Sequence, residues 1–213
     1  MKKASILVLT LLLLVVSNGC GPRRTYQTYV VPPRIDLTQH DMIGVIEIDS
    51  SSKGELGPLT TRRFTDEARR DQGLVRIIRL GTEADALASV GRTKLDRESL
   101  KALGRKHGVQ TILIGKLDVS DIRPDVRISS VLESGSVTAR VNATLAVELV
   151  ETASGASIWS SSSRASDSVG QISVFSGGGV VFDADDPDRA YGSLVDKLVH
   201  DATWDFRVTY ERR

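Results

Sequence analysis

The clearest pattern in the chain is an alternation of apolar and polar residues between positions 134 and 155. Apolar side chains occupy every second position there: Val137, Ala139, Val141, Ala143, Leu145, Val147 and Leu149. Successive side chains of a β-strand point to opposite faces of a sheet, so this period of two predicts a long, half-buried antiparallel strand. The turn TASG follows it. Residues 157–169 (SIWSSSSRASDSV) are predicted to form the returning strand.

Four further segments have the composition of strands. Residues 42–49 (MIGVIEID) and 74–81 (LVRIIRLG) are short apolar runs rich in β-branched residues, and 109–122 (VQTILIGKLDVSDI) is a longer one. Residues 171–183 (QISVFSGGGVVFD) have the pattern of a second hairpin, with the glycine triplet Gly177–Gly179 at its tip. Glycine and polar clusters bound these runs, as is typical of strand ends.

Three helices are predicted between residues 58 and 108. Residues 58–72 carry an apolar stripe, with Pro58 suited to the first turn and Gly73 after the end. A short helix over 82–91 follows, with Thr82 as a candidate N-cap. The next helix has Leu95 or Asp96 near its start, and Gly108 closes it.

A last helix is predicted from Asp186, a candidate N-cap, with Pro187 at the first helical position. Its apolar stripe consists of Tyr191, Leu194, Val195, Leu198, Val199 and Ala202. Strands and helices intermingle first, and several strands then follow in succession. This order predicts an α/β (α+β) fold in residues 42–213, a single three-layer-like domain in which helices pack on a mixed sheet of about five or six strands.

The first 19 residues have the pattern of a secretory signal. Lys2 and Lys3 precede an apolar run from Ala4 to Val16, about 13 residues, which is shorter than the ~20 needed to span a bilayer. Small residues follow, and then Cys20, the single cysteine of the chain. A secreted protein with a chance thiol and an uncleaved signal anchor are the alternatives that this pattern leaves open.

This segment resembles the signal peptide and lipobox of bacterial lipoproteins. The resemblance implies cleavage after Gly19 and lipid attached to Cys20, so that the chain is anchored to a membrane. Gly21 in place of the aspartate that marks inner-membrane retention favours the outer membrane. Residues 20–41, with three prolines and no consistent period, are interpreted as the lipidated N-terminus and a flexible tether, or as a segment part of which packs on the domain.

Charge and composition exclude some classes of partner. The full chain has 28 basic and 27 acidic side chains, and removing Lys2 and Lys3 with the leader leaves a formal charge of −1. We therefore expect no nucleic-acid partner. Aromatic residues make up 5% of the chain, which argues against a large carbohydrate-stacking platform.

No known catalytic or metal-binding motif is found. The acidic run DADDPD (183–188) has Asp188 and Leu194 where an EF-hand loop needs Gly and Glu. The three histidines lack metal-ligand spacing, and Asp49 and Glu47 at the end of the first strand are interpreted as exposed polar ends. We expect no cofactor, no metal and no enzymatic activity.

Trp159 and Trp204 are the two largest side chains available as anchors. Each is interpreted as a core or half-core residue. If one of them is exposed, it is a candidate contact for a partner protein, because tryptophan is enriched at binding hot spots.

The order of elements is similar to that of the envelope lipoproteins related to the curli secretion component and to the lipoprotein activators of penicillin-binding proteins. Two motifs carry the resemblance, which spans about residues 42–207. They are matched by Leu103, Gly104, Lys106, Gly108, Val109 and Gly115, and by Gly155, Trp159 and Ser160.

The resemblance implies a periplasm-facing accessory protein without catalysis that binds another envelope protein. The alternative is a subunit of an oligomeric outer-membrane secretion channel of the curli-export type, which crosses the membrane with two hairpins per subunit. Residues 137–149 have the length of such a strand, whereas the polar run SSSSRASDS (160–168) does not suit a lipid face. The sequence therefore favours the activator-like role, and it does not fix the oligomeric state.

Overall fold

The computed structural model describes residues 27–125, 138–169, 172–174, 180–182 and 185–212. They fall into two units, one formed by residues 32–208 and one formed by the two ends of the described chain. The leader, Cys20 and the glycine triplet lie outside the described residues.

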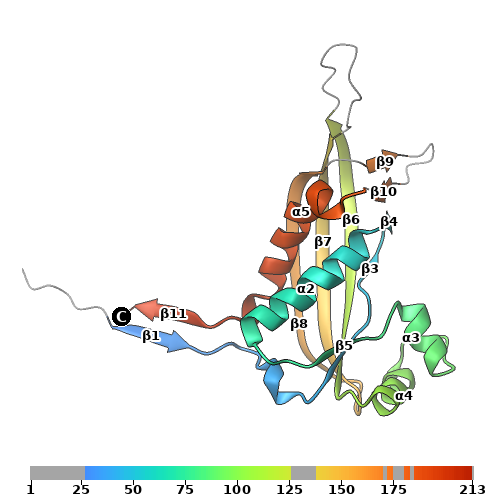
Figure 1. The fold of residues 1–213 in the computed structure, drawn as a ribbon, viewed down its shortest axis with the longest axis vertical. Coiled ribbons are helices and arrows are strands. Elements are labelled where there is room, and N and C mark those ends of the chain that lie inside the picture. The colour runs from blue at the N-terminus through green and yellow to red at the C-terminus, as the bar shows by residue number, and fades with distance from the viewer. Residues whose placement is uncertain (1–26, 126–137, 170–171, 175–179, 183–184, 213) are drawn as a thin grey trace, which may run out of the picture. The chain divides into compact units, whose positions relative to one another are not determined.

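The larger unit contains a six-stranded mixed sheet in the order β5-β2-β6-β7-β8, with β3 paired to β6 (Figure 1). Its strands are β2 (Ile43–Val45), β3 (Asp49–Ser50), β5 (Ile77–Arg79), β6 (Thr111–Asp125), β7 (Thr138–Glu151) and β8 (Ser157–Val169). Strands β2, β3 and β5 run parallel to their neighbours, whereas β6, β7 and β8 form an antiparallel meander. The predicted fold class, a mixed sheet with helices packed on it, is confirmed.

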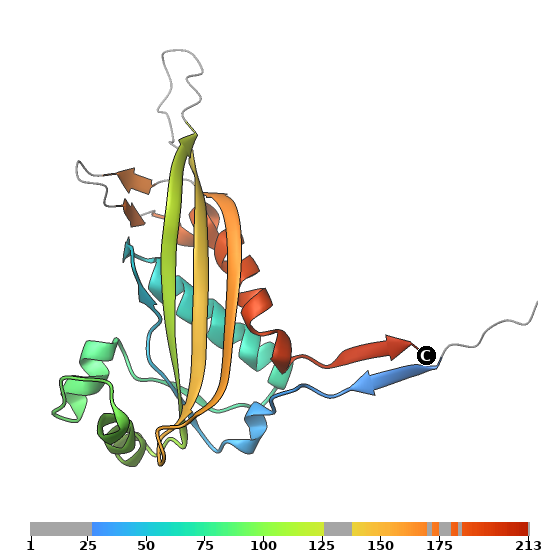
Figure 2. The same ribbon diagram turned by 180° about the vertical axis from the view of Figure 1, so that it is seen from behind.

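The alternation that predicted β7 produces its two faces. The apolar positions of β7 are buried: Ala139, Val141, Ala143, Leu145, Val147 and Leu149. They face the helices α2 (Leu56–Gln72) and α5 (Pro187–Ala202), which lie in front of the sheet in Figure 1. Seen from behind, β6, β7 and β8 lie in front of these helices (Figure 2).

A second, smaller core forms around α3 (Glu83–Ser89) and α4 (Arg97–His107). Ile112 and Val150 are opposed in the β6–β7 register and belong to this core, whereas the next pair, Leu113 and Leu149, belongs to the larger one. Side chains of adjacent strand residues therefore pack into different cores on opposite faces of the sheet. The sheet is the middle layer, between α2 and α5 on one face and α3 and α4 on the other.

The predicted helix caps are confirmed. Thr82 caps α3, with Asp85 completing a capping box, and Asp96 caps α4 in the same way with Ser99. Gly108 ends α4 with a φ of +67°, a left-handed conformation in which glycine has no Cβ penalty. Asp186 accepts a hydrogen bond from the Arg189 N–H at the start of α5.

Element bounds differ from the predicted ones where apolar runs meet loops. The run 42–49 divides into β2 and β3, and the run 74–81 keeps only Ile77–Arg79 as β5. Leu74 is fully exposed because Gly73, at a φ of +72°, turns the chain away at the end of α2. The second hairpin is confirmed as the antiparallel pair β9 (Ile172–Val174) and β10 (Val180–Phe182). Strand β10 also pairs with β4 (Lys53–Gly54).

Part of the segment assigned to the tether packs on this unit. Leu37, in the short 3-10 helix η1 (Leu37–Gln39), is a core residue. Its N–H donates to Gln72 Oε1 at 2.8 Å, and Gln72 Nε2 donates to the carbonyl of Ile35 at 3.0 Å. Gln72, at the end of α2, thereby fixes the backbone of residues 35–37.

The smaller unit contains a two-stranded antiparallel ribbon of β1 (Thr28–Val31) and β11 (Thr209–Arg212). Four-residue strands from opposite ends of the chain have no period long enough to be recognised in sequence, and neither strand was predicted.

Candidate functional site

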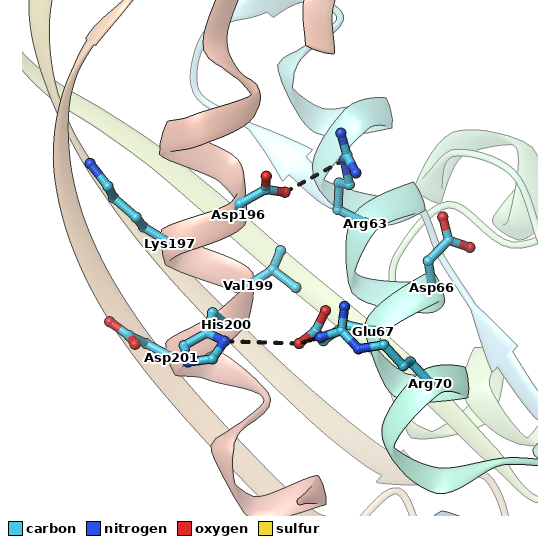
Figure 3. Close-up of a pocket in the computed structure, with 9 residues that line it drawn as sticks. All are labelled: Arg63, Asp66, Glu67, Arg70, Asp196, Lys197, Val199, His200 and Asp201. Carbon is cyan, nitrogen blue, oxygen red and sulfur yellow. Dashed lines mark ion pairs between the residues drawn. The ribbon is translucent and has the colours of Figure 1, made fainter. Parts of the chain in front are cut away.

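The surface between α2 and α5 is hollowed into a groove of about 600 Å³ (Figure 3). Eight of its nine lining side chains are charged or titratable, and both helices supply both signs of charge. The lining residues are Arg63, Asp66, Glu67, Arg70, Asp196, Lys197, Val199, His200 and Asp201.

Helical spacing explains how the two helices meet. Arg63, Glu67 and Arg70 recur at intervals of four and three residues and share one face of α2, and Asp196 and His200 share one face of α5. Arg63 Nε lies 3.5 Å from Asp196 Oδ1, and His200 Nδ1 lies 3.9 Å from Glu67 Oε1. The apolar stripes of both helices face the sheet, so their charged flanks border the groove.

A nearly buried arginine stands beside this groove. The Arg207 guanidinium donates to Glu67 Oε1 at 2.9 Å and to Asp71 Oδ2 at 3.0 Å. It also donates to Thr203 Oγ1 at 2.9 Å and to the His200 carbonyl at 2.8 Å. The side chains of Arg207, Glu67 and Asp71 are 14%, 12% and 13% exposed. Arginine suits this role because its planar fork of donors binds several acceptors at once.

This arrangement presents Trp204 to solvent. Trp204 begins the 3-10 helix η2 (Trp204–Phe206) directly after α5, and its side chain is 55% exposed. The Arg207 N–H donates to the Trp204 carbonyl at 3.2 Å, and the Arg207 guanidinium lies 5.8 Å from the centre of the indole. Phe206, two residues later, is buried. The indole is therefore exposed on a backbone that is fixed on both sides.

Trp159 has the opposite environment. It is 7% exposed, its Nε1 donates to Asp205 Oδ2 at 3.2 Å, and its ring centroid lies 4.7 Å from that of Phe206. Trp159 is thus a core residue, and it contacts Asp205 and Phe206 of η2. Trp204 is the tryptophan available to a partner.

Helix α5 is also attached to the edge strand β8. Ser163 Oγ donates to the Leu198 carbonyl at 2.7 Å, and Lys197 Nζ donates to Asp167 Oδ2 at 2.9 Å. Burial raises the pKa of Asp167, but hydrogen bonds from Ser193, Lys197 and Ser168 outweigh it, so the pKa lies below its usual value. These contacts hold α5, which forms one side of the groove, against β8.

The carboxylates at the end of the first predicted strand lie elsewhere. Asp49 is exposed in β3 and lines a separate hollow of about 530 Å³ on the sheet. Burial raises the pKa of Glu47, the carboxylates of Glu55 and Asp85 raise it further, and Arg79 opposes them.

The remaining sequence motifs have structural roles. Asp188, within the acidic run, accepts from Arg62 at 2.9 Å and from Arg63 at 2.6 Å, while positions 183–184 lie outside the described residues. Among the residues that the structure describes, no three His, Cys, Asp or Glu side chains are grouped so as to hold a metal ion. None of the described helices has the length and apolarity needed to cross a membrane.

Sequence reasoning singled out Trp204 as a candidate but missed the groups that hold it. Glu67 and Asp71 are ordinary polar positions of an amphipathic helix, and nothing in their local sequence pairs them with Arg207. The one available signal is Arg207 itself, a cation directly after the buried Phe206. Sequence could not place its partners about 140 positions earlier in the chain.

No family model matches the chain, and no curated protein matches it. Among solved structures, it is similar to the PelC dodecamer from Paraburkholderia phytofirmans, at 13% identity and a TM-score of 0.43, covering 86% of this chain and 98% of that one. It is similar to the LpoB C-terminal domain from Salmonella enterica, at 13% identity and a TM-score of 0.38, covering 63% and 84%. It is also similar to lipoprotein GNA1162 from Neisseria meningitidis, at 16% identity and a TM-score of 0.36. That similarity covers 60% of this chain and 83% of that one. At these identities and TM-scores no function passes from these proteins to the chain.

Proposed function

We propose that the chain is a lipid-anchored, periplasm-facing accessory protein of the cell envelope that binds a partner protein through the surface around Trp204. The observation that carries the binding role is the half-exposed indole on a fixed backbone beside a charged groove. Hot spots combine such an aromatic anchor with surrounding polar groups that exclude water. The leader and Cys20 support the anchor and the envelope location.

In this proposal the protein works by presentation. The lipid holds the N-terminus at the membrane, the domain is not an enzyme, and Trp204 with the groove engages a partner. The resemblance noted in the sequence suggests that the partner is involved in envelope assembly, as for the activators of peptidoglycan synthases. The groove's mixed charges suit a polar partner surface of complementary pattern, because complementary charge fixes register and suppresses wrong partners.

Photocrosslinking tests the proposed surface. A photoreactive phenylalanine analogue replaces Trp204 in the full-length protein in intact cells, and a matched variant carries it at Lys101, exposed on α4. We expect one specific adduct from position 204 and none from position 101. The same adduct from both positions, or none from 204, would overturn the assignment of the surface.

The captured partner then allows a quantitative test. We expect Trp204→Ala to weaken its binding by about 30-fold, which corresponds to the ~2 kcal/mol typical of a hot-spot residue. Trp204→Phe, which keeps an aromatic ring, should retain most of the affinity. Unchanged binding of Trp204→Ala would show that the partner is held elsewhere.

A further inference from the structure

The ribbon formed by β1 and β11 has two chemically different faces. Directly opposed residues of an antiparallel pair project to the same side of the sheet. Val30 is opposed by Tyr210 and Thr28 by Arg212, so these four residues share one face. Tyr29, Glu211, Val31 and Thr209 share the other face.

The face that carries Val30 and Tyr210 is the more exposed one. Val30 is 64% and Tyr210 69% exposed, whereas Tyr29 on the other face is 49% exposed and Val31 and Thr209 are half-buried. A two-stranded sheet is at best marginally stable in water by itself. An exposed aromatic residue beside an exposed aliphatic one suits the boundary between headgroups and acyl chains.

The chain itself places a bilayer within reach of this ribbon. Residues 21–27 separate Cys20 from Thr28. Fully extended, the eight Cα–Cα steps from Cys20 to Thr28 span at most about 28 Å, at ~3.5 Å per step. A lipid on Cys20 therefore keeps β1 near the membrane surface whatever the conformation of the intervening residues. A protein partner has no such covalent reason to lie beside the ribbon.

We propose that the face of Val30 and Tyr210 lies on the headgroup layer of the membrane that holds the anchor. This inference rests on the proposed lipid anchor at Cys20 and adds a second contact to it. A single acyl chain gives only marginal membrane binding, and additional chains or a basic, apolar contact strengthen it.

Depth-dependent quenching tests this contact in the full-length mature protein, purified in detergent and reconstituted into phosphatidylethanolamine–phosphatidylglycerol vesicles. Thr28→Cys and Thr209→Cys provide a matched pair of fluorophore sites on the two faces, and both leave Val30, Tyr210 and Arg212 unchanged. With nitroxide-labelled headgroups in the vesicles, we expect quenching at position 28 to be several-fold stronger than at position 209.

Second variants identify the side chains. Tyr210→Ser combined with Val30→Ser should abolish the difference between the two positions, whereas Tyr29→Ser should leave it intact.

The outcomes separate the two proposals. A protein that does not float with the vesicles contradicts the anchor itself. A protein that floats but shows equal quenching at positions 28 and 209, or none at either, keeps the anchor and overturns the ribbon contact. A change in the fluorescence at position 28 that occurs only after a purified envelope partner is added would assign this face to a protein partner. That result would also overturn the ribbon contact with the membrane.

Discussion

Arg207 shows how one side chain supports the candidate surface. It connects the end of α2, through Glu67 and Asp71, to the turn after α5, and its guanidinium lies beside Trp204. Burying charges costs solvation free energy, which favourable geometry and hydrogen bonds offset. Arg70 also contacts Glu67 and Asp71, but its side chain is largely exposed. Removing Arg207 therefore leaves two nearly buried carboxylates with one exposed cation.

We expect Arg207→Met to lower the free energy of unfolding by about 3 kcal/mol, the lower end of the range for breaking a buried ion pair. Urea unfolding followed by circular dichroism measures it. Arg34→Met is the control, because Arg34 is 80% exposed in its pair with Asp205 and should cost under about 1 kcal/mol. Similar losses for the two variants would show that the buried network contributes no more than a surface pair.

Glu47 gives a pH-dependent prediction. Its pKa is raised above the model-compound value of 4.5, mainly by burial, so the folded state binds its proton more tightly than the unfolded chain does. Its contribution to stability is therefore present below about pH 4.5 and is lost as the pH rises through the raised pKa. We expect Glu47→Gln to be more stable than the wild type at pH 7, with the difference vanishing near pH 4.

Urea midpoints of the two proteins at both pH values measure this effect. Comparing variant with wild type at each pH cancels the contributions of titrating groups that do not interact with Glu47. A variant that is less stable at pH 7, or equally stable, would contradict the inferred desolvation of Glu47.

The two tryptophans show where sequence reasoning stops at this scale. Trp159 lies between Ile158 and Ser160 and Trp204 between Thr203 and Asp205, and neither pair of neighbours decides whether the indole is buried. Trp159 is buried because α5 and Phe206 cover the edge of β8, and Trp204 is exposed because α5 ends before it. Both facts depend on packing between segments far apart in the chain.

Among the secondary-structure elements, α4 shows why the glycines of the first matched motif are required. A Cβ built on Gly104 would lie 2.5 Å from Thr152 Oγ1 and 2.6 Å from Thr152 Cβ. Thr152 cannot move freely, because its hydroxyl donates to the carbonyls of Val109 and Gln110 at 3.0 Å. The backbone of α4 therefore approaches the end of β7 more closely than any other residue would allow.

We expect Gly104→Ala to destabilise the domain by roughly 1–3 kcal/mol, the usual cost of overpacking. In an isolated helix the same substitution would stabilise by about 1 kcal/mol, so the sign of the effect distinguishes packing from helix propensity. Lys101→Ala, on the exposed side of α4, is the control and should change stability little. A stabilised Gly104→Ala variant would contradict the close approach of α4 and β7.

An element could be predicted where neighbouring residues in the sequence determine its conformation, and not where distant residues do. The long alternation of β7, the caps of α3, α4 and α5 and the closing Gly108 were all predicted, because each depends on neighbouring residues. The split of 42–49, the short β5 and the ribbon were not, because pairing partners decide them. The packing of Leu37 likewise depends on Gln72 of α2.

For the whole molecule, the sequence predicted the layered mixed sheet, since the order of strands and helices restricts how they can cover one another. It predicted Trp204 as a possible contact but not the groove beside it, which needs α2 and α5 side by side. The anchor at Cys20 stays a prediction from the leader, and the location of the protein, its presentation role and the ribbon contact all depend on it.

Mass spectrometry of the mature protein extracted from membranes tests this central claim most directly. We expect a chain that begins at Cys20, with a diacylglyceryl group on the sulfur and an acyl group on the new amino terminus. A chain that retains the leader, or a bare thiol at Cys20, would contradict the proposed anchor.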